Sequence, residues 1–396
     1  MMLSSLLSPI LDTLPPVVWL VVAAIGHAAI LSVSLNIWYG HALPHEFLSF
    51  QRKLHTFLVP AGPIVFVLLY GLDPASAWRT HPAGWRCIPA LYLLACWLTA
   101  LVALPLATAA RLLRRLPTAQ RSNDTRTLDV AQHLGYKPVG DGKHRRLARL
   151  PYNECFQVDL TEKTFMLPQL PAAWDGLKIL HLTDVHLCGT PEREFYFHVM
   201  DQCRDWQPDL LALTGDIVDS PRHHRWVLPV LGRLRWNIAA FAILGNHDNW
   251  YEPARTRRRL QKLGMRVLAN SWEQIDVRGQ PLVVVGHEGP WFAPAPDVSA
   301  CPENVFRLCL SHTPDNIPWA RRHGVDLMLA GHNHGGQIRL PVVGSILVPS
   351  RFSRRYDCGT FHEPPTLLHV CRGLGGQHPL RYNCRPEVTC LILRKG

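Results

Sequence analysis

Charged side chains are scarce in the first 110 residues of this 396-residue chain. Of its 41 Lys and Arg and 30 Asp and Glu residues, only seven lie there: Asp12, Glu46, Arg52, Lys53, Asp73, Arg79 and Arg86. The stretches 13–45, 54–72 and 87–110 contain no charge at all. Each can cross a bilayer core of ~30 Å, which takes about 20 helical residues, and none has the charged face of a soluble helix. The sequence therefore predicts three transmembrane helices, at about 17–38, 54–72 and 87–110, the second of which contains Pro60 and Pro63.

Other absences narrow the class of protein. No heptad or short repeat is sustained, which excludes a coiled coil and a solenoid. No basic residue precedes the first apolar stretch, which disfavours a cleaved signal peptide. With 47% hydrophobic and 18% charged residues, the chain is too apolar to be disordered. We expect a membrane region at 1–110, a basic membrane-proximal connector at 111–160 and a globular domain at 161–396, because one core rarely organises so long a chain.

The distribution of Lys and Arg predicts the orientation of these helices. Six basic residues lie on one side of the three predicted spans and two, Arg79 and Arg86, on the other; the six are Arg52, Lys53, Arg111, Arg114, Arg115 and Arg121. Because basic loops stay on the cytoplasmic side, the N-terminus is expected outside and the globular domain in the cytoplasm. The predicted location is the inner (cytoplasmic) membrane, crossed several times.

Cysteine usage agrees with that orientation. The soluble part has no CxxC pair and an odd number of cysteines: Cys155, Cys188, Cys203, Cys301, Cys309, Cys358, Cys371, Cys384 and Cys390. Such a set is typical of free thiols in a reducing compartment.

A net charge of +11 raises the question of nucleic-acid binding. The basic clusters are 111–121, 144–149 and 255–262, and the first two follow the last predicted span. Attraction to anionic lipid, or simple solvation, explains them with fewer assumptions than a groove-reading surface. We therefore expect a membrane partner and no nucleic acid.

Short apolar runs recur in the globular part. They are 177–183, 209–214, 238–244, 281–286, 305–311 and 326–330, with stretches of helical length between several of them, such as 192–206, 253–263 and 314–322. Runs that are apolar throughout are typical of strands buried on both faces. The class is therefore α/β with a central sheet.

Polar clusters follow five of these runs. They are Thr183-Asp184-Val185-His186, Gly215-Asp216-Ile217-Val218-Asp219, Gly245-Asn246-His247-Asp248, Ser311-His312, and Gly331-His332-Asn333-His334-Gly335. The carboxyl ends of strands meet at one edge of an open α/β sheet, so we expect these side chains to converge. Taken alone, each motif is explained as well by an ordinary turn or a solvated histidine as by a metal site. Together, Asp, His and Asn without a thiolate predict a site for hard or borderline divalent metals.

In this combination the motifs resemble those of the calcineurin-like metallophosphoesterases. The likeness covers 177 to the C-terminus and is greatest to the bacterial, often membrane-anchored YkuE/YaeI-type group, because of Gly331–Pro341, Arg372-Gly-Leu-Gly, and Pro379-Leu-Arg381 with Arg385-Pro-Glu387. Two departures are Asn333, where that group usually has Thr, and three spans in place of one anchor. The resemblance implies a four-layer α/β/β/α sandwich.

The resemblance also implies roles for individual residues. Asp184, His186 and His334 would hold one metal ion, and Asp216 would bridge it to a second ion. Asn246, His312 and His332 would complete the coordination of that second ion. His247 would protonate the leaving group with Asp248 as its orienter, and Asp219 would support a ligand instead of binding an ion. His287, which also follows a strand, is a rival to His312; the Ser-His-Thr-Pro-Asp context favours His312.

The implied activity is hydrolysis of a phosphate ester or pyrophosphate bond with two divalent ions, which acidify water and offset charge on the phosphoryl oxygens. Mn is expected, and Fe or Zn also suit the ligand set. A lipid-linked substrate such as UDP-2,3-diacylglucosamine is favoured by the anchor and because some relatives cleave it. A cyclic-nucleotide or general phosphodiesterase is the alternative. A catalytically silent metal-binding regulator is disfavoured because no ligand is missing, and a channel because the spans lack internal charge.

Overall fold

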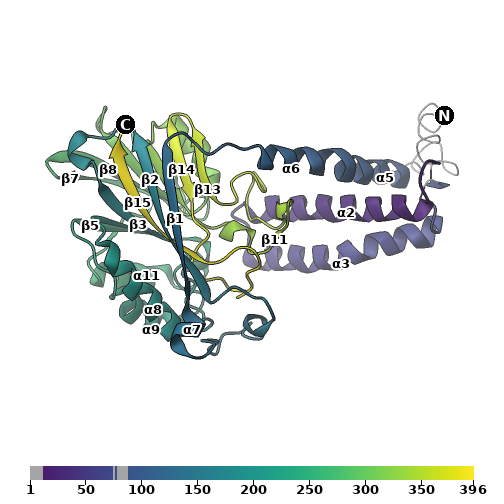
Figure 1. Ribbon diagram of the computed structural model, residues 1–396, viewed down its shortest axis with the longest axis horizontal. Helices are drawn as coiled ribbons and strands as arrows, with labels where there is room; N and C mark the ends of the chain where they lie inside the picture. The colour runs from purple at the N-terminus through teal and green to yellow at the C-terminus, as the bar shows by residue number, and fades with distance from the viewer. Residues whose placement is uncertain (1–11, 75, 78–87) are drawn as a thin grey trace. The chain divides into compact units, whose positions relative to one another are not determined.

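The computed structural model describes residues 12–74, 76–77 and 88–396, and the chain forms two compact units. The helical unit comprises Met1–Arg115 together with Pro341–Leu347, and the globular unit comprises Leu116–Leu340 and Val348–Gly396. Figure 1 labels the elements of both units. The sequence did not show that the short segment Pro341–Leu347 groups with the helices.

Three helices of the helical unit are long and apolar enough to cross a membrane. They are α2 (Pro16–Tyr39), α3 (His45–Tyr70), and a third formed by α5 (Ile88–Leu98), a π-helical stretch (Thr99–Ala103) and α6 (Leu104–Leu112). The predicted start of the third span at Cys87, and the loop residues Arg79 and Arg86, lie outside the described residues.

Two of these helices differ from the prediction in detail. Helix α3 begins at His45, so it includes Arg52 and Lys53, and it continues through Pro60 and Pro63. Apolar helices tolerate internal proline when the freed carbonyls find other partners. The π-helical stretch ends at Ala103, two residues before Pro105, whose ring nitrogen cannot donate a hydrogen bond of the helix.

Polar contacts join the three helices inside the helical unit. His27 Nδ1 lies 2.7 Å from Tyr92 Oη, and its Nε2 lies 2.9 Å from Leu58 O. Trp97 Nε1 donates to Trp19 O at 2.9 Å. Side-chain hydrogen bonds of this kind join apolar helices to one another because hydrocarbon offers no other partner.

The globular unit is built on two sheets. The first has the order β1 (Gln120–Asp129), β2 (Gln157–Leu167), β15 (Glu387–Lys395), β3 (Leu177–Leu182), β4 (Leu210–Thr214), β5 (Ala239–Ile243) and β6 (Arg266–Val267). The second has the order β13 (Gly359–Glu363), β14 (Thr366–Val370), β10 (Leu327–Ala330), β9 (Phe306–Ser311), β8 (Gln280–His287) and β7 (Trp272–Val277). The short strands β11 (Arg339–Leu340) and β12 (Gly344–Ser345) pair separately.

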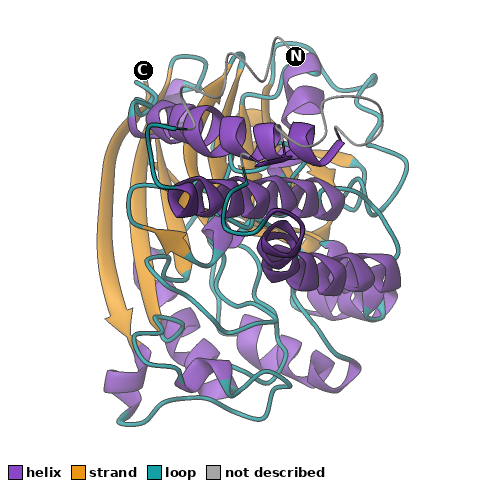
Figure 2. Ribbon diagram, turned by 90° about the vertical axis from the view of Figure 1, so that its right-hand side faces the viewer, coloured by secondary structure: helices purple, strands orange, loops and turns teal. Residues whose placement is uncertain are grey.

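The two sheets pack face to face and carry helices on their outer faces. Trp174, Phe241 and Leu308 belong to the apolar core between the sheets. Helices α8 (Arg193–Cys203), α9 (His224–Leu231) and α11 (Pro253–Lys262) cover the first sheet, and α12 (Ile317–Arg322) covers the second. This arrangement confirms the four-layer sandwich and the α/β class. Figure 2 shows the strands in orange, with long loops in teal at their ends.

All six predicted apolar runs form strands, but in two sheets. β3, β4 and β5 run parallel in the first sheet, and β8, β9 and β10 run parallel in the second. The expected connector contributes β1, which pairs antiparallel with β2, and α7 (Val130–Leu134). Strand β1 has the sequence QRSNDTRTLD and is mostly exposed, so it has no apolar run that would predict it. Polar side chains also protect an edge strand from pairing with other chains.

Candidate metal centre

All seven predicted metal ligands lie a few residues after the end of a strand. Asp184 and His186 follow β3, Asp216 follows β4, and Asn246 begins the short helix α10 (Asn246–Trp250) after β5. His312 follows β9, and His332 and His334 follow β10. The carboxyl ends of the parallel strands of both sheets thus bring these side chains together, although the sequence separates them by up to 150 positions (184 to 334).

The backbone is strained at most of these positions. A left-handed conformation, with φ between 48° and 67°, is adopted by Asp184, His186, Asp216, His332 and His334. Residues other than glycine rarely adopt it, and each instance costs about 1–3 kcal/mol and persists where the surroundings enforce it. Five such residues around one site indicate a function, because these turns direct their side chains toward one another.

Gly215 lets two of the loops approach closely. A Cβ atom there would lie 2.6 Å from Gly245 N and 2.8 Å from His312 Nδ1, and φ is +95°. Any side chain would push the Asp216 loop away from His312.

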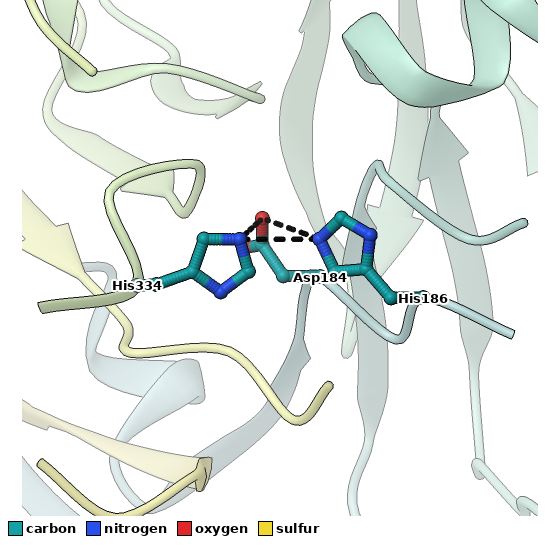
Figure 3. Close-up of side chains that lie close together, drawn as sticks. All are labelled: Asp184, His186 and His334. Atoms are coloured by element: carbon teal, nitrogen blue, oxygen red, sulfur yellow. Dashed lines mark hydrogen bonds and ion pairs between the residues drawn. The ribbon is translucent and has the colours of Figure 1, made fainter. Parts of the chain in front are cut away.

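The first cluster consists of Asp184, His186 and His334. Asp184 Oδ1 lies 3.7 Å from His186 Nε2 and 3.5 Å from His334 Nε2, and the two imidazole nitrogens are 3.1 Å apart. Figure 3 shows the three side chains turned toward one another. All three donor atoms can therefore reach one cation between them.

The second cluster consists of Asp216, His312 and His332, with Asn246 beside it. His312 Nε2 lies 3.2 Å from Asp216 Oδ2, 3.2 Å from His332 Nδ1 and 3.1 Å from Asn246 Oδ1. Carboxylate, imidazole and amide oxygen again form the donor set, which suits a divalent cation of borderline softness.

Asp216 lies between the two clusters. Its Oδ2 lies 3.2 Å from His312 Nε2 and 3.6 Å from His186 Nε2, and its Oδ1 accepts a hydrogen bond from His247 N at 2.8 Å. A single buried carboxylate between two donor clusters has the geometry of a bridging ligand.

Asp219 contacts the rings of both His186 and His247. Its carboxylate lies 2.9 Å from His186 Nδ1 and 2.8 Å from His247 Nδ1. A carboxylate on Nδ1 fixes the imidazole so that Nε2 faces the opposite way, as in many metal sites. Asp219 thus supports a candidate ligand, and the same contact orients His247.

Asp248 does not orient His247 through its side chain, contrary to the sequence expectation. Its buried carboxylate instead accepts hydrogen bonds from the backbone N–H groups of Gly245, Ile217 and Val218, at 3.0–3.1 Å for the shortest contact of each. Asp248 therefore joins the Asp216 loop to the Asn246 loop. Burial and the neighbouring Asp216 raise the pKa of Asp248 to about 7, despite these hydrogen bonds.

Electrostatics favours ionised carboxylates in both clusters, but it acts differently on the four imidazoles. Burial acts against ionisation, but the imidazole of His312 holds the pKa of Asp216 well below its usual range, and that of His334 does the same for Asp184. Burial lowers the pKa of His332 to about 3 and the pKa of His334 well below its usual value. The neighbouring carboxylates instead raise the pKa of His312 to about 9 and the pKa of His186 well above its usual value, although burial opposes this. Cations bind ionised carboxylate and neutral imidazole, so a metal ion at these two histidines would have to displace protons.

Arg381 is a buried residue to which the sequence assigned no role. It is 1% exposed, and its guanidinium donates to the carbonyl oxygens of His334 (3.1 Å), Arg372 (3.0 Å) and Gly375 (2.7 Å). Gly375 N in turn donates to Asp184 O at 2.7 Å. Arg381 thus ties together the loops that carry two members of the first cluster.

Two tryptophans border the centre. The Trp291 ring centroid lies 4.7 Å from that of His332 and 5.5 Å from that of His312. Trp250 lies 4.7 Å from His247. Aromatic side chains beside a polar cluster provide apolar contact area for a bound molecule. Neither tryptophan stands in a motif, so neither could be predicted from the sequence.

His287 is placed away from both clusters. Its Nδ1 lies 3.2 Å from Asn316 Nδ2 and 3.2 Å from Gly289 N, and its ring packs against Trp319. Among the described residues, the groups able to hold a metal include His312 and not His287. Asn333, the departure from the family pattern, donates to Tyr356 O at 2.8 Å.

Comparison with known proteins agrees with the fold and the motifs. A family model for the calcineurin-like phosphoesterases matches residues 177–336. The chain is similar to the uncharacterized metallophosphoesterase YkuE of Bacillus subtilis, with 31% identity over 252 residues, which are 61% of this chain and 88% of the relative. The phosphodiesterase YaeI of Escherichia coli is 34% identical over 224 residues, 54% of this chain and 82% of the relative.

A third relative is the UDP-2,3-diacylglucosamine pyrophosphatase LpxG of Chlamydia muridarum, with 23% identity over 292 residues, 59% of this chain and 88% of the relative. The chain belongs to the calcineurin-like metallophosphoesterases. The resemblance to the YkuE and YaeI group, expected from the motifs, is confirmed.

Proposed function

We propose that the protein is a membrane-anchored phosphoesterase that uses two divalent metal ions. The observation that carries the proposal is the position of Asp216 Oδ2, within 3.6 Å of both His186 Nε2 and His312 Nε2. Asp184, His186 and His334 would hold one ion, and Asn246, His312 and His332 the other, with Asp216 between them. When bound, such a pair supplies a nucleophile at neutral pH and offsets charge on the phosphoryl oxygens.

His247 is the proposed proton donor to the leaving group. Its Nε2 lies 4.0 Å from Asp216 Oδ2, at the junction of the two clusters, while Asp219 holds its Nδ1. The carboxylates of Asp219 and Asp216 raise the pKa of His247 above its ordinary value although burial opposes this. A histidine held protonated and aimed at the junction can deliver a proton to a departing oxygen.

The proposed substrate is a lipid-linked phosphoester or pyrophosphate, such as UDP-2,3-diacylglucosamine. Three observations support it: three helices apolar enough to cross a membrane, similarity to a relative that is named as a pyrophosphatase of that lipid, and the apolar surface that Trp291 and Trp250 add beside the clusters. Mn²⁺ is the proposed metal, and Fe or Zn suit the same donors. Similarity to a phosphodiesterase favours a general or cyclic-nucleotide phosphodiesterase as the second candidate.

A substrate panel tests this function. The purified, detergent-solubilised full-length chain with Mn²⁺ is assayed against a monoester, a diester, a cyclic nucleotide and a nucleotide-diphosphate lipid. We expect the highest kcat/KM for the nucleotide-linked lipid, because only that molecule uses both the phosphoryl site and the apolar surface. A higher kcat/KM for the cyclic nucleotide would favour the second candidate. No hydrolysis of any of the four would contradict a phosphoesterase.

The proposed orientation, which rests on the distribution of Lys and Arg, places the globular unit in the cytoplasm. Tyr152 is 91% exposed, so Tyr152→Cys offers a reactive thiol that is easier to reach than the native cysteines. In intact cells a membrane-impermeant thiol reagent should label this variant no more than wild type, and permeabilisation should expose it. Labelling in intact cells would reverse the orientation and shift the expected substrate to exported phosphoesters.

A further inference from the structure

The segment Pro341–Leu347 belongs to the helical unit although it lies within the phosphoesterase sequence. The buried side chain of Asn36, 2% exposed on α2, donates to Ile346 O at 3.0 Å. Gly344 lies against the guanidinium of Arg111 near the end of α6, and a side chain at this glycine would collide with it. The segment therefore contacts two helices of the unit at defined positions.

Those contacts fix the depth of the segment along the helices. Helix α2 has 24 residues, and Asn36 lies between eight and nine residues past its midpoint, which is roughly 13 Å at 1.5 Å per residue. Arg111 lies 11 residues past the midpoint of the 25-residue third helix, which is roughly 16 Å. A hydrocarbon core of ~30 Å ends at about 15 Å from its centre. Both contacts place the segment where the acyl chains meet the headgroups.

The segment presents apolar side chains at this level. It has the sequence PVVGSIL with no charged residue, and Val342 is 67% and Leu347 52% exposed. Val342 also has a φ of 66°, a conformation that is a true outlier for a β-branched residue. Glycine or asparagine would fit that turn with less strain, so backbone conformation does not explain an exposed valine at this position.

We propose that Pro341–Leu347 is a lipid-contacting segment that lies in the boundary between headgroups and acyl chains, with Val342 and Leu347 among the lipids. The proposal rests on the membrane anchorage proposed above. The basic residues Arg111, Arg114 and Arg115 at the end of the third helix suit the same boundary, because they attract anionic headgroups. The segment starts seven positions after His334, so the proposed lipid contact is close along the chain to a candidate ligand loop.

A depth measurement tests the proposal without using activity. Val342→Cys and Leu347→Cys are labelled with an environment-sensitive fluorophore in the full-length protein, reconstituted into phosphatidylcholine–phosphatidylglycerol vesicles. The vesicles contain lipids spin-labelled either near the headgroup or near the end of the acyl chain. Ile25→Cys, in the middle of α2 and 47% exposed, is the deep control, and Tyr152→Cys is the aqueous control. Labelled wild type measures the background from native cysteines.

We expect the shallow spin label to quench positions 342 and 347 at least about twofold more than the deep label, with the order reversed at Ile25 and neither label effective at Tyr152. Behaviour like Tyr152 at 342 and 347, with Ile25 still in hydrocarbon, would overturn the segment proposal and leave the anchorage intact. An aqueous signal at Ile25 would reject the anchorage itself. Blue-shifted emission at 342 without quenching by either lipid would assign the segment to contact with a second copy and also overturn the proposal.

Discussion

The substitution Asp216→Asn is expected to abolish turnover and to lower bound metal from two ions per chain toward one or none. Oδ2 of this carboxylate lies 3.2 Å from His312 Nε2 and 3.6 Å from His186 Nε2, so both clusters lose the same negative charge. A neutral amide bridges two cations poorly. Removing a group that merely supports a ligand typically costs 10–100-fold, so loss of the shared ligand should exceed ~100-fold in kcat.

The measurement is kcat on the best substrate of the panel, together with elemental analysis of the same sample. Asp276→Asn is a matched control, because Asp276 is exposed and its carboxylate only accepts a hydrogen bond from Gly279 N at the turn after β7. The control should retain wild-type activity and metal content. Activity of Asp216→Asn within tenfold of wild type, with two ions still bound, is incompatible with a bridging role.

The substitution His247→Gln is expected to retain both metal ions while lowering kcat by about 10²-fold or more for a substrate with a poor leaving group. The loss should be much smaller for a nitrophenyl ester, because nitrophenolate departs with little protonation. The structure strengthens this expectation, since Asp219 holds His247 Nδ1 at 2.8 Å and leaves Nε2 directed at the junction of the clusters.

His287→Gln provides the matched control for this experiment. His287 is also buried, at the end of strand β8, but its Nδ1 contacts Asn316 and Gly289 instead of a cluster. This control should leave the ratio of the two kcat values unchanged. Equal losses for both leaving groups in His247→Gln would show that His247 positions the substrate and does not donate the proton.

The sequence predicted the parts of the fold that depend on continuous apolar runs. β4 and β5 are buried throughout, and β3 is buried at every residue except Lys178, so their position was visible as mostly apolar residues bounded by Asp, His and Gly. Strand β1 was not predicted because its residues are polar and exposed at the edge of a sheet. The residues alone also indicated one sheet; the second followed from the family resemblance, since buried strands of either sheet look alike in sequence.

For the site, the sequence predicted which residues converge but not which contacts they make. Asp219 and Asp248 are both aspartates in the motifs that follow strands. Only the turn geometry decides that Asp219 contacts the ring of His247 while Asp248 accepts hydrogen bonds from backbone N–H groups. Arg381 holds carbonyl oxygens of separate loops, an interaction that leaves no spacing pattern. Such contacts depend on tertiary structure and are invisible to motif reading.

The metal content of the wild-type protein tests the central claim most directly. The purified chain is stripped with a chelator, loaded with Mn²⁺, freed of unbound ion, and examined by elemental analysis and electron paramagnetic resonance. A shared Asp216 between two clusters predicts two ions per chain with the spectrum of a spin-coupled pair, and loss of that coupling in Asp216→Asn. An active wild-type enzyme with one ion, or with two uncoupled ions, would contradict the account.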